Sequence, residues 1–383
     1  MQPYPLIAMS CFLGSCALAC DTDPMPKDVS GALAKIVETS KIPGMAAAIY
    51  KDGAVTTTGA AGLRALGREE KVTIQDKWHL GSCTKAMTAT LAGVLVEQGV
   101  VTWETTLEGA FARIDMKPAW KPCTLDMLLH NRGGVPGDLN KDGLWGRLWS
   151  TKAGPRDARQ DLLRTVLSWE PASAPGTKYE YANGGFTIAG AMLERFADKP
   201  WEELVQSQVF TPLGITSAGF GAPGTPGKFD QPCGHVKGKA IGPGPGSDNP
   251  AAIGPAGTVH MTISDWARFV GAHAAGESTP GKDDKRILKP ETFKKLHTAA
   301  PDPKTQYAMG WLVTTRPWAK GVGKGDTGRV LNHNGSNTMW YCVAWVAPER
   351  DFAVVVACNQ GDGDAAKACD QAAATLIQLD AIK

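Results

Sequence analysis

The spacing of hydrophobic residues changes along the chain, and each spacing predicts a different kind of element. Residues 86–99 are apolar on nearly every side and end in glycine, which is typical of a buried helix. Residues 29–39 carry apolar side chains at helical spacing, and residues 45–50 and 54–60 are short apolar runs joined by the turn sequence Lys-Asp-Gly. The chain therefore opens with a helix and a β-hairpin.

The C-terminal part of the chain has the shorter period of strands. Residues 308–314, 329–333, 339–347 and 351–358 are predicted strands, and residues 365–379 form a closing helix. The run at 339–347 is apolar on both faces, which predicts a central strand covered on both sides.

The middle of the chain holds several predicted helices and a predicted surface loop rich in Gly and Pro at 221–255. These elements together predict an α+β fold, in which strands from both chain ends form one antiparallel sheet flanked by helices, with an inserted, mostly helical subdomain. We place a single domain over residues 21–383. Its sheet part covers about 28–80 and 255–383, and its helical part about 81–254.

The N-terminal residues 1–20 carry no charged side chain and resemble an export signal. They are too short to form a membrane-spanning helix. The sequences Leu-Gly-Ser-Cys16 and Ala-Leu-Ala-Cys20 resemble lipoprotein cleavage boxes, in which the cysteine becomes the lipidated first residue. We therefore expect an exported protein, periplasmic or secreted, with Cys16 or Cys20 as a candidate lipid anchor to a membrane.

The charge of the chain is nearly balanced, with a formal net charge of +2 and no clustered run of Lys and Arg, so no nucleic-acid partner is expected. Six scattered cysteines follow the predicted signal, and disulfides in an exported chain and buried free thiols are both open. The sequence contains no Cys-x-x-Cys or His-x-x-x-His spacing, so neither a metal site nor a cofactor is predicted.

The strongest candidate for chemistry is the sequence Gly-Ser-Cys-Thr-Lys at 81–85, at the start of the predicted buried helix. Residues three apart share a helix face, so Lys85 lies within reach of the Ser82 hydroxyl. A serine becomes a nucleophile when a neighbouring base removes its proton, and the N–H groups of a helix N-terminus favour the oxyanion that follows. The alternative is a capping serine beside a solvated lysine, which a helix buried on all sides disfavours.

Two further motifs carry suitable chemistry. Tyr181 and Asn183 are two residues apart; a tyrosine near a lysine can relay protons, and an asparagine can bond a substrate amide. His333, Gly335 and Ser336 end a predicted strand, where glycine lets a substrate approach and the Ser336 amide can face an oxyanion. Taken alone, each motif is better explained as an ordinary loop or turn.

In this order and at these distances, the three motifs resemble those of the serine β-lactamase-like family, which includes class C β-lactamases, D-alanyl-D-alanine carboxypeptidases and the related family VIII esterases. The resemblance covers nearly the whole chain after the signal and implies a β-lactamase/transpeptidase-like catalytic domain. It implies Ser82 as the nucleophile, Lys85 and Tyr181 as the proton-transfer pair, and the Ser82 and Ser336 amides as the oxyanion hole. The substrate-binding residues that it implies are Asn183, His333, Gly335 and Ser336.

One position departs from the family pattern. The third motif usually reads Lys-Thr-Gly and its lysine helps to hold a substrate carboxylate, whereas His333 stands here. A histidine carries at most part of a positive charge near pH 7, so we expect weaker carboxylate binding. We therefore expect a serine hydrolase that cleaves small esters or amides through an acyl-enzyme on Ser82. The alternatives are a β-lactamase or D-Ala-D-Ala carboxypeptidase acting on β-lactams or cell-wall peptides and, less favoured, a penicillin-binding sensor that does not hydrolyse.

Overall fold

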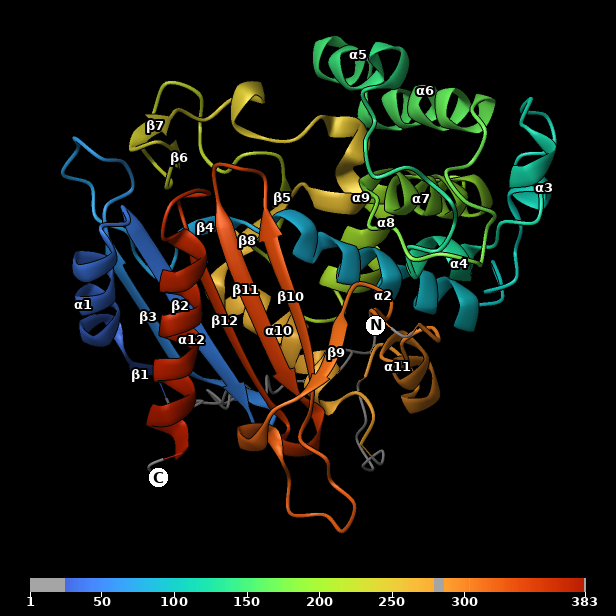
Figure 1. Ribbon diagram of the computed structural model, residues 1–383. Helices are drawn as coiled ribbons and strands as arrows, with labels where there is room; N and C mark the ends of the chain where they lie inside the picture. The colour runs from blue at the N-terminus through green and yellow to red at the C-terminus, as the bar shows by residue number, and fades with distance from the viewer. Residues whose placement is uncertain (1–24, 279–285, 303, 382–383) are drawn as a thin grey trace, which may run out of the picture.

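A seven-stranded sheet forms the centre of the computed structural model, which describes residues 25–278, 286–302 and 304–381 (Figure 1). Neighbouring strands are antiparallel, except that the short β1 runs parallel to β3. Both ends of the described chain contribute strands, so the predicted α+β arrangement is confirmed. In spatial order the strands are β1 (Lys27–Asp28), β3 (Ala54–Gly62), β2 (Gly44–Lys51), β12 (Phe352–Cys358), β11 (Tyr341–Ala347), β10 (Arg329–Ser336) and β9 (Leu312–Thr315).

Helices cover both faces of this sheet, which is why its central strands are apolar on both sides. Every residue of β12 is buried. Val354 and Val356 pack with Leu33 and Leu376 on one face, whereas Val355 belongs to the larger core on the other face. The covering helices are α1 (Ser30–Ser40) and α12 (Ala365–Ala381) on one side and α10 (Ile263–Ala275) on the other (Figure 1).

A mostly helical part stands beside the sheet (Figure 1). Its central helix is α2, of which residues 84–95 are all buried, as expected of a helix that is apolar nearly all round. The helices here are α2 (Thr84–Glu97), α3 (Leu107–Ala110), α4 (Leu125–Leu129), α5 (Leu144–Ser150), α6 (Pro155–Ser168), α7 (Asn183–Ala197), α8 (Trp201–Val205), α9 (Gly254–Gly257) and α11 (Pro290–Leu296).

Two small sheets complete the architecture. The first joins β4 to β8 and β5 and lies where the central sheet meets the start of α2 (Figure 1). The second is a hairpin of β6 and β7 within the Gly- and Pro-rich segment. Their bounds are β4 (Lys77–His79), β8 (Val259–Thr262), β5 (Gly219–Phe220), β6 (Gly234–Val236) and β7 (Lys239–Ile241).

The structure differs from the sequence prediction in two places. The predicted strand at 308–314 is strand only as β9, because Gly310 adopts a φ of +85° and turns the chain before Leu312. The prediction of a surface loop at 221–255 is wrong in part, because the segment contains the β6–β7 hairpin and buried residues, among them His235, Ser247 and Asp248.

Residues 1–20, with the predicted export signal and the candidate anchors Cys16 and Cys20, lie outside the described residues. Within the described ranges, no helix is long and apolar enough to cross a membrane. The six cysteines from Cys83 to Cys369 are all buried and free, so of the two alternatives left open by the sequence the structure has thiols.

Candidate active site

Ser82 lies in a single 3₁₀ turn, η1 (Gly81–Cys83), that connects β4 to α2. Gly81 adopts a φ of +46°, a conformation that residues with a side chain rarely take. A Cβ atom on Gly81 would lie 2.5 Å from the amide nitrogen of Ser336. Glycine at this position therefore lets the Ser82 turn pack directly against the end of β10.

Lys85 is completely buried one helical turn after Ser82. Its Nζ lies 3.0 Å from Ser82 Oγ, 2.8 Å from Asn183 Oδ1 and 2.9 Å from the carbonyl oxygen of Ala256. Burial disfavours the charged ammonium and lowers the pKa of Lys85 from 10.5 to about 7. The predicted proximity of Ser82 and Lys85 is therefore present, and a large share of the lysine is neutral near pH 7.

The three partners of Lys85 suit the neutral amine. Asn183 Oδ1 and the Ala256 carbonyl can only accept hydrogen bonds, whereas the Ser82 hydroxyl can donate one. A neutral amine has two N–H groups and one lone pair, so it can donate to both oxygens and accept from Ser82. This arrangement directs the lone pair of Lys85 at the hydroxyl proton of Ser82.

Tyr181 contacts the same lysine through its aromatic ring. The Lys85 Nζ is 4.7 Å from the centre of the Tyr181 ring. Although 38% of the Tyr181 surface is exposed, desolvation raises its pKa well above the usual range, and the nearby Ser82 hydroxyl offsets only part of this effect. Tyr181 therefore stays a protonated phenol at neutral pH, suited to passing a proton on but not to removing one as a phenolate.

Asn183 is the first residue of α7. Because its side-chain oxygen accepts the bond from Lys85, this half of the amide orients the base. The structure thus brings Ser82, Lys85, Tyr181 and Asn183 together, as the motif order predicted.

His333 lies on β10 with its side chain buried behind Tyr181. Its Nδ1 is 2.6 Å from the carbonyl oxygen of Asn334, so Nδ1 carries a proton, and Nε2 is 3.2 Å from the hydroxyl of Tyr307. The rings of Tyr181, Tyr307 and His333 form one cluster, with centres 5.9 to 6.3 Å apart. Both nitrogens of His333 therefore have partners inside the protein.

The residues after His333 alternate across β10. Asn334 and Ser336 are exposed, and Gly335 is buried. A side chain on Gly335 would overlap the carbonyl oxygen of Leu80. Glycine at this position therefore lets β10 pack against the chain just before the Ser82 turn. This close approach places the Ser336 amide beside the turn.

Two residues near the site carried no signal of their own in the sequence. Asn131 is buried at a φ of +55°; its side-chain oxygen accepts a bond from the amide of Ala182 at 3.2 Å, and its carbonyl accepts one from Glu180 at 2.8 Å. It therefore anchors the loop that carries Tyr181. Tyr307 is also buried and contacts His333, and no neighbouring motif marks it.

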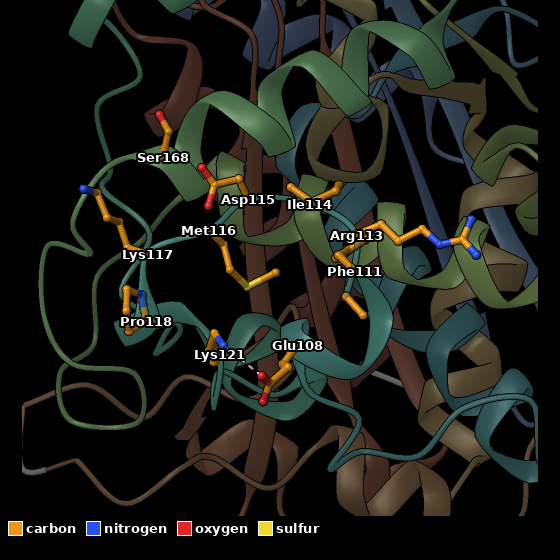
Figure 2. Close-up of a pocket in the computed structure, with 11 residues that line it drawn as sticks. Glu108, Phe111, Arg113, Ile114, Asp115, Met116, Lys117, Pro118, Lys121 and Ser168 are labelled. Atoms are coloured by element: carbon orange, nitrogen blue, oxygen red, sulfur yellow. Dashed lines mark hydrogen bonds and ion pairs between the residues drawn. The ribbon is translucent and has the colours of Figure 1, made fainter.

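A separate open hollow lies elsewhere on the helical part (Figure 2). Its volume is about 900 Å³, and its walls come from α3, the chain after it and the end of α6. Phe111, Ile114 and Met116 supply apolar surface, and the ion pair between Lys121 and Glu108 lies at its edge. None of its lining residues belongs to the Ser82 site. Within the described ranges, no group of three or more His, Cys, Asp or Glu side chains could hold a metal ion.

An antiparallel sheet built from both chain ends, with Ser82, Lys85 and Tyr181 where it meets a helical part, defines a β-lactamase/transpeptidase-like protein. The family model described as Beta-lactamase matches residues 29–377. The chain belongs to the Beta-lactamase family, whose members are serine hydrolases.

Several curated relatives are similar to this chain. The Beta-lactamase of Escherichia coli (strain K12) is 28% identical over 266 residues, which cover 67% of this chain and 65% of the relative, just under two thirds of its length. Penicillin-binding protein 4 of Amycolatopsis lactamdurans is 28% identical over 84% of this chain and 81% of its own. The D-aminopeptidase of Brucella anthropi is 26% identical over 83% of this chain and 56% of its own.

Solved structures share the fold. The octameric penicillin-binding protein homologue from Pyrococcus abyssi superposes with a TM-score of 0.72 at 21% identity, covering 91% of this chain and 76% of that chain. SurE superposes with a TM-score of 0.69 at 22% identity, covering 88% and 72%.

Proposed function

We propose that this chain is a serine hydrolase that forms an acyl-enzyme on Ser82 and acts on small esters or amides. The observation that carries the proposal is the fully buried Lys85, 3.0 Å from Ser82 Oγ, with two other neighbours that only accept hydrogen bonds. Burial keeps much of this lysine neutral near pH 7, which is the state that a general base requires.

In the acylation step, Ser82 Oγ forms a bond to the substrate carbonyl carbon while Lys85 Nζ takes the hydroxyl proton. The amides of Ser82 and Ser336 stabilise the negative charge on the carbonyl oxygen. The bond to the leaving group then breaks, and the leaving group takes the proton from Lys85 through the phenol of Tyr181. Water then attacks the carbonyl carbon of the acyl-enzyme and gives a proton to Lys85. The bond from that carbon to Ser82 Oγ breaks, Ser82 takes the proton back from Lys85, and the acid product leaves.

The substrate class follows from the third motif. A lysine at position 333 would supply a fixed cation for a substrate carboxylate, whereas His333 is bonded through both nitrogens to Asn334 and Tyr307. This environment supports substrates whose acyl part carries no carboxylate. The alternative is hydrolysis of β-lactams or D-Ala-D-Ala peptides, which the similarity to proteins named Beta-lactamase and Penicillin-binding protein 4 supports.

A substrate panel tests the proposal. The purified chain is assayed with a short-chain aryl ester, with nitrocefin and with a D-Ala-D-Ala peptide, and Ser82 is labelled with a serine-reactive phosphonate and located by peptide mass spectrometry. Ser82→Ala should abolish turnover and labelling, whereas Ser168→Ala, an exposed serine at the end of α6, should leave both unchanged. Hydrolysis retained by Ser82→Ala would overturn the assignment, and preference for nitrocefin or the peptide would select the alternative.

A non-hydrolysing penicillin sensor is the rival from another class of protein. A sensor would be acylated once and would release no further product. Pre-steady-state kinetics separate the two, because a burst that is followed by no turnover on any substrate of the panel would identify a sensor.

Export and lipid anchoring remain proposals that rest on the N-terminal sequence. We propose that the chain is exported and processed before Cys16 or Cys20. Mass spectrometry of the protein from its native host tests this, and an intact N-terminal Met1 on the mature protein would contradict it.

A further inference from the structure

Just before the nucleophile turn, His79 at the end of β4 pairs with Asp248, and both residues are buried. His79 Nε2 is 2.5 Å from Asp248 Oδ1. Its other nitrogen, Nδ1, lies 3.1 Å from the amide nitrogen of Gly81, the residue directly before Ser82. Neither side chain touches Lys85 or the tyrosines through a hydrogen bond in the described part of the chain.

The partners of the ring assign its proton. A backbone amide can only donate, so Nδ1 must be bare to accept from Gly81. The Asp248 carboxylate can only accept, so it fixes the proton on Nε2. In this way Asp248 selects the one neutral form of His79 that can hold the Gly81 amide.

Gly81 is the point at which this bond can affect chemistry. Its left-handed backbone sets the direction of the next peptide, which carries the Ser82 amide. The same residue lies against Ser336, whose amide is the other proposed oxyanion donor. A rotation at Gly81 would therefore move an oxyanion donor and the nucleophile together.

The loop that carries Asp248 also supports the base. The side chain of Asn249 donates to the carbonyl oxygen of Gly257 at 2.8 Å. Gly257 follows Ala256, whose carbonyl accepts the hydrogen bond from Lys85 at 2.9 Å. Adjacent residues of one loop thus hold the nucleophile turn and one partner of the lysine.

Ser247, the residue before Asp248, contacts the end of β10, which is the third part of the site. The carbonyl oxygen of Ser247 accepts a bond from the Asn337 side chain at 3.3 Å, and Asn337 follows Ser336 at the end of β10. Residues 247–249 therefore contact the supports of the nucleophile, the base and the oxyanion strand.

We propose that His79 and Asp248 are positioning residues that hold the Gly81–Ser82 turn in its reactive geometry. They set the rate of Ser82 acylation without touching the substrate. The inference rests on the proposed function, since it concerns the reactivity of Ser82 as a nucleophile.

Two substitutions at His79 distinguish the hydrogen bond to Asp248 from the hydrogen bond to Gly81. His79→Gln extends an amide toward Asp248 and removes the acceptor for Gly81. His79→Asn places an oxygen near the former Nδ1 and can still accept from Gly81. We expect His79→Gln to lower kcat and the rate of phosphonate labelling about 10²-fold with little change in KM, because a small misplacement of reacting groups has an effect of this size. His79→Asn should recover most of that loss.

Asp248→Asn tests the role of the carboxylate with almost no change of shape. The asparagine can present an N–H to Nε2, which favours the ring form that cannot accept from Gly81, so labelling should slow about 10-fold. In the His79→Asn background no ring remains, and Asp248→Asn should have no further effect. This non-additivity would not arise from general destabilisation. If His79→Gln fails to fold, the Asp248→Asn comparison alone decides the question.

His235 supplies the matched control. It is a buried histidine whose Nε2 accepts from the amide of Leu66 at 3.1 Å and whose Nδ1 donates to the carbonyl of Asn359, without contact to Ser82. His235→Gln should lower Tm as His79→Gln does but keep wild-type kcat. Wild-type labelling in His79→Gln, or an equal loss of kcat in His235→Gln, would overturn the inference. A wild-type protein that never labels at Ser82 would instead refute the proposed function.

Discussion

Replacing Lys85 with methionine should sharply lower activity and, at the same time, change how stability depends on pH. Burial lowers the pKa of Lys85 from 10.5 to about 7. The difference corresponds to about 5 kcal/mol by which the folded protein disfavours the charged lysine. This cost exists because Lys85 is fully buried, and Lys85→Met removes it.

The direction of the effect follows from proton binding. Between pH 7 and 10.5 the unfolded chain keeps a proton on Lys85 that the folded protein has lost, so the free energy of unfolding rises with pH across this window by about 1.4 kcal/mol per pH unit. The destabilisation of the folded protein by Lys85 is complete below pH 7 and absent above pH 10.5. Lys85→Met lacks the group. Both proteins share the other titrating groups, of which the buried Cys83 thiol also responds to the substitution, because Lys85 lowers its pKa.

Urea unfolding of both proteins at pH 7.0 and pH 9.5 measures the effect. We expect the stability of Lys85→Met relative to wild type to fall by about 3 kcal/mol between the two pH values. The hydrogen bonds lost with the lysine shift both values alike and cancel in the comparison. Lys35→Met, at an exposed position of α1, should show no such pH dependence.

The same pKa predicts the activity profile. Wild-type kcat/KM should fall about tenfold per pH unit below 7 and level off above it, because only neutral Lys85 can accept the Ser82 proton. Lys85→Met should lose about 10² to 10⁴ of kcat/KM. A relative stability that does not change between pH 7.0 and 9.5, or an activity that still rises steeply above pH 9, would refute the reasoning.

Three further substitutions test the β10 side of the site. His333→Lys should raise kcat/KM for carboxylate-bearing β-lactams about tenfold, because it adds a cation for the carboxylate; no gain in the nitrocefin assay would count against the account of this position. Gly335→Ala should lose at least about 100-fold in activity and about 1–3 kcal/mol in urea unfolding, since its Cβ would overlap the Leu80 carbonyl. Tyr307→Phe removes the hydroxyl partner of His333 and should slow turnover while leaving KM near wild type; an effect on KM alone would place Tyr307 in substrate binding instead.

The features that the sequence predicts well are local ones. The helix that begins beside Ser82 follows from an apolar run, and the Ser82–Lys85 contact follows from a three-residue helical spacing. The central β11 follows from a run that is apolar on both faces. Each of these signals lies within about ten residues of chain, which is the range over which helix and strand periodicity acts.

The features that the sequence does not predict are contacts between residues that are distant in the chain. His79 and Asp248 are 169 positions apart, and no spacing links them. Asp248 lies in a segment whose Gly and Pro content predicts a loop, so its burial follows only from the histidine that it meets. Tyr307 contacts His333, and it precedes the turn at Gly310 that interrupts the strand predicted at 308–314.

The chemistry of Lys85 itself depends on such distant contacts. The low pKa of Lys85 requires that its side chain be buried on all sides. Helix α2 buries only one side of it, and this is the part of the burial that the local sequence predicts. Asn183 and Ala256, which are 98 and 171 positions away in the chain, help to bury the other sides of Lys85. Any change that loosens either segment and admits water should raise the pKa of Lys85 toward 10.5 before it unfolds the protein. The acid limb of the activity profile would then move to higher pH, so this limb reports the packing of the whole site rather than the lysine alone.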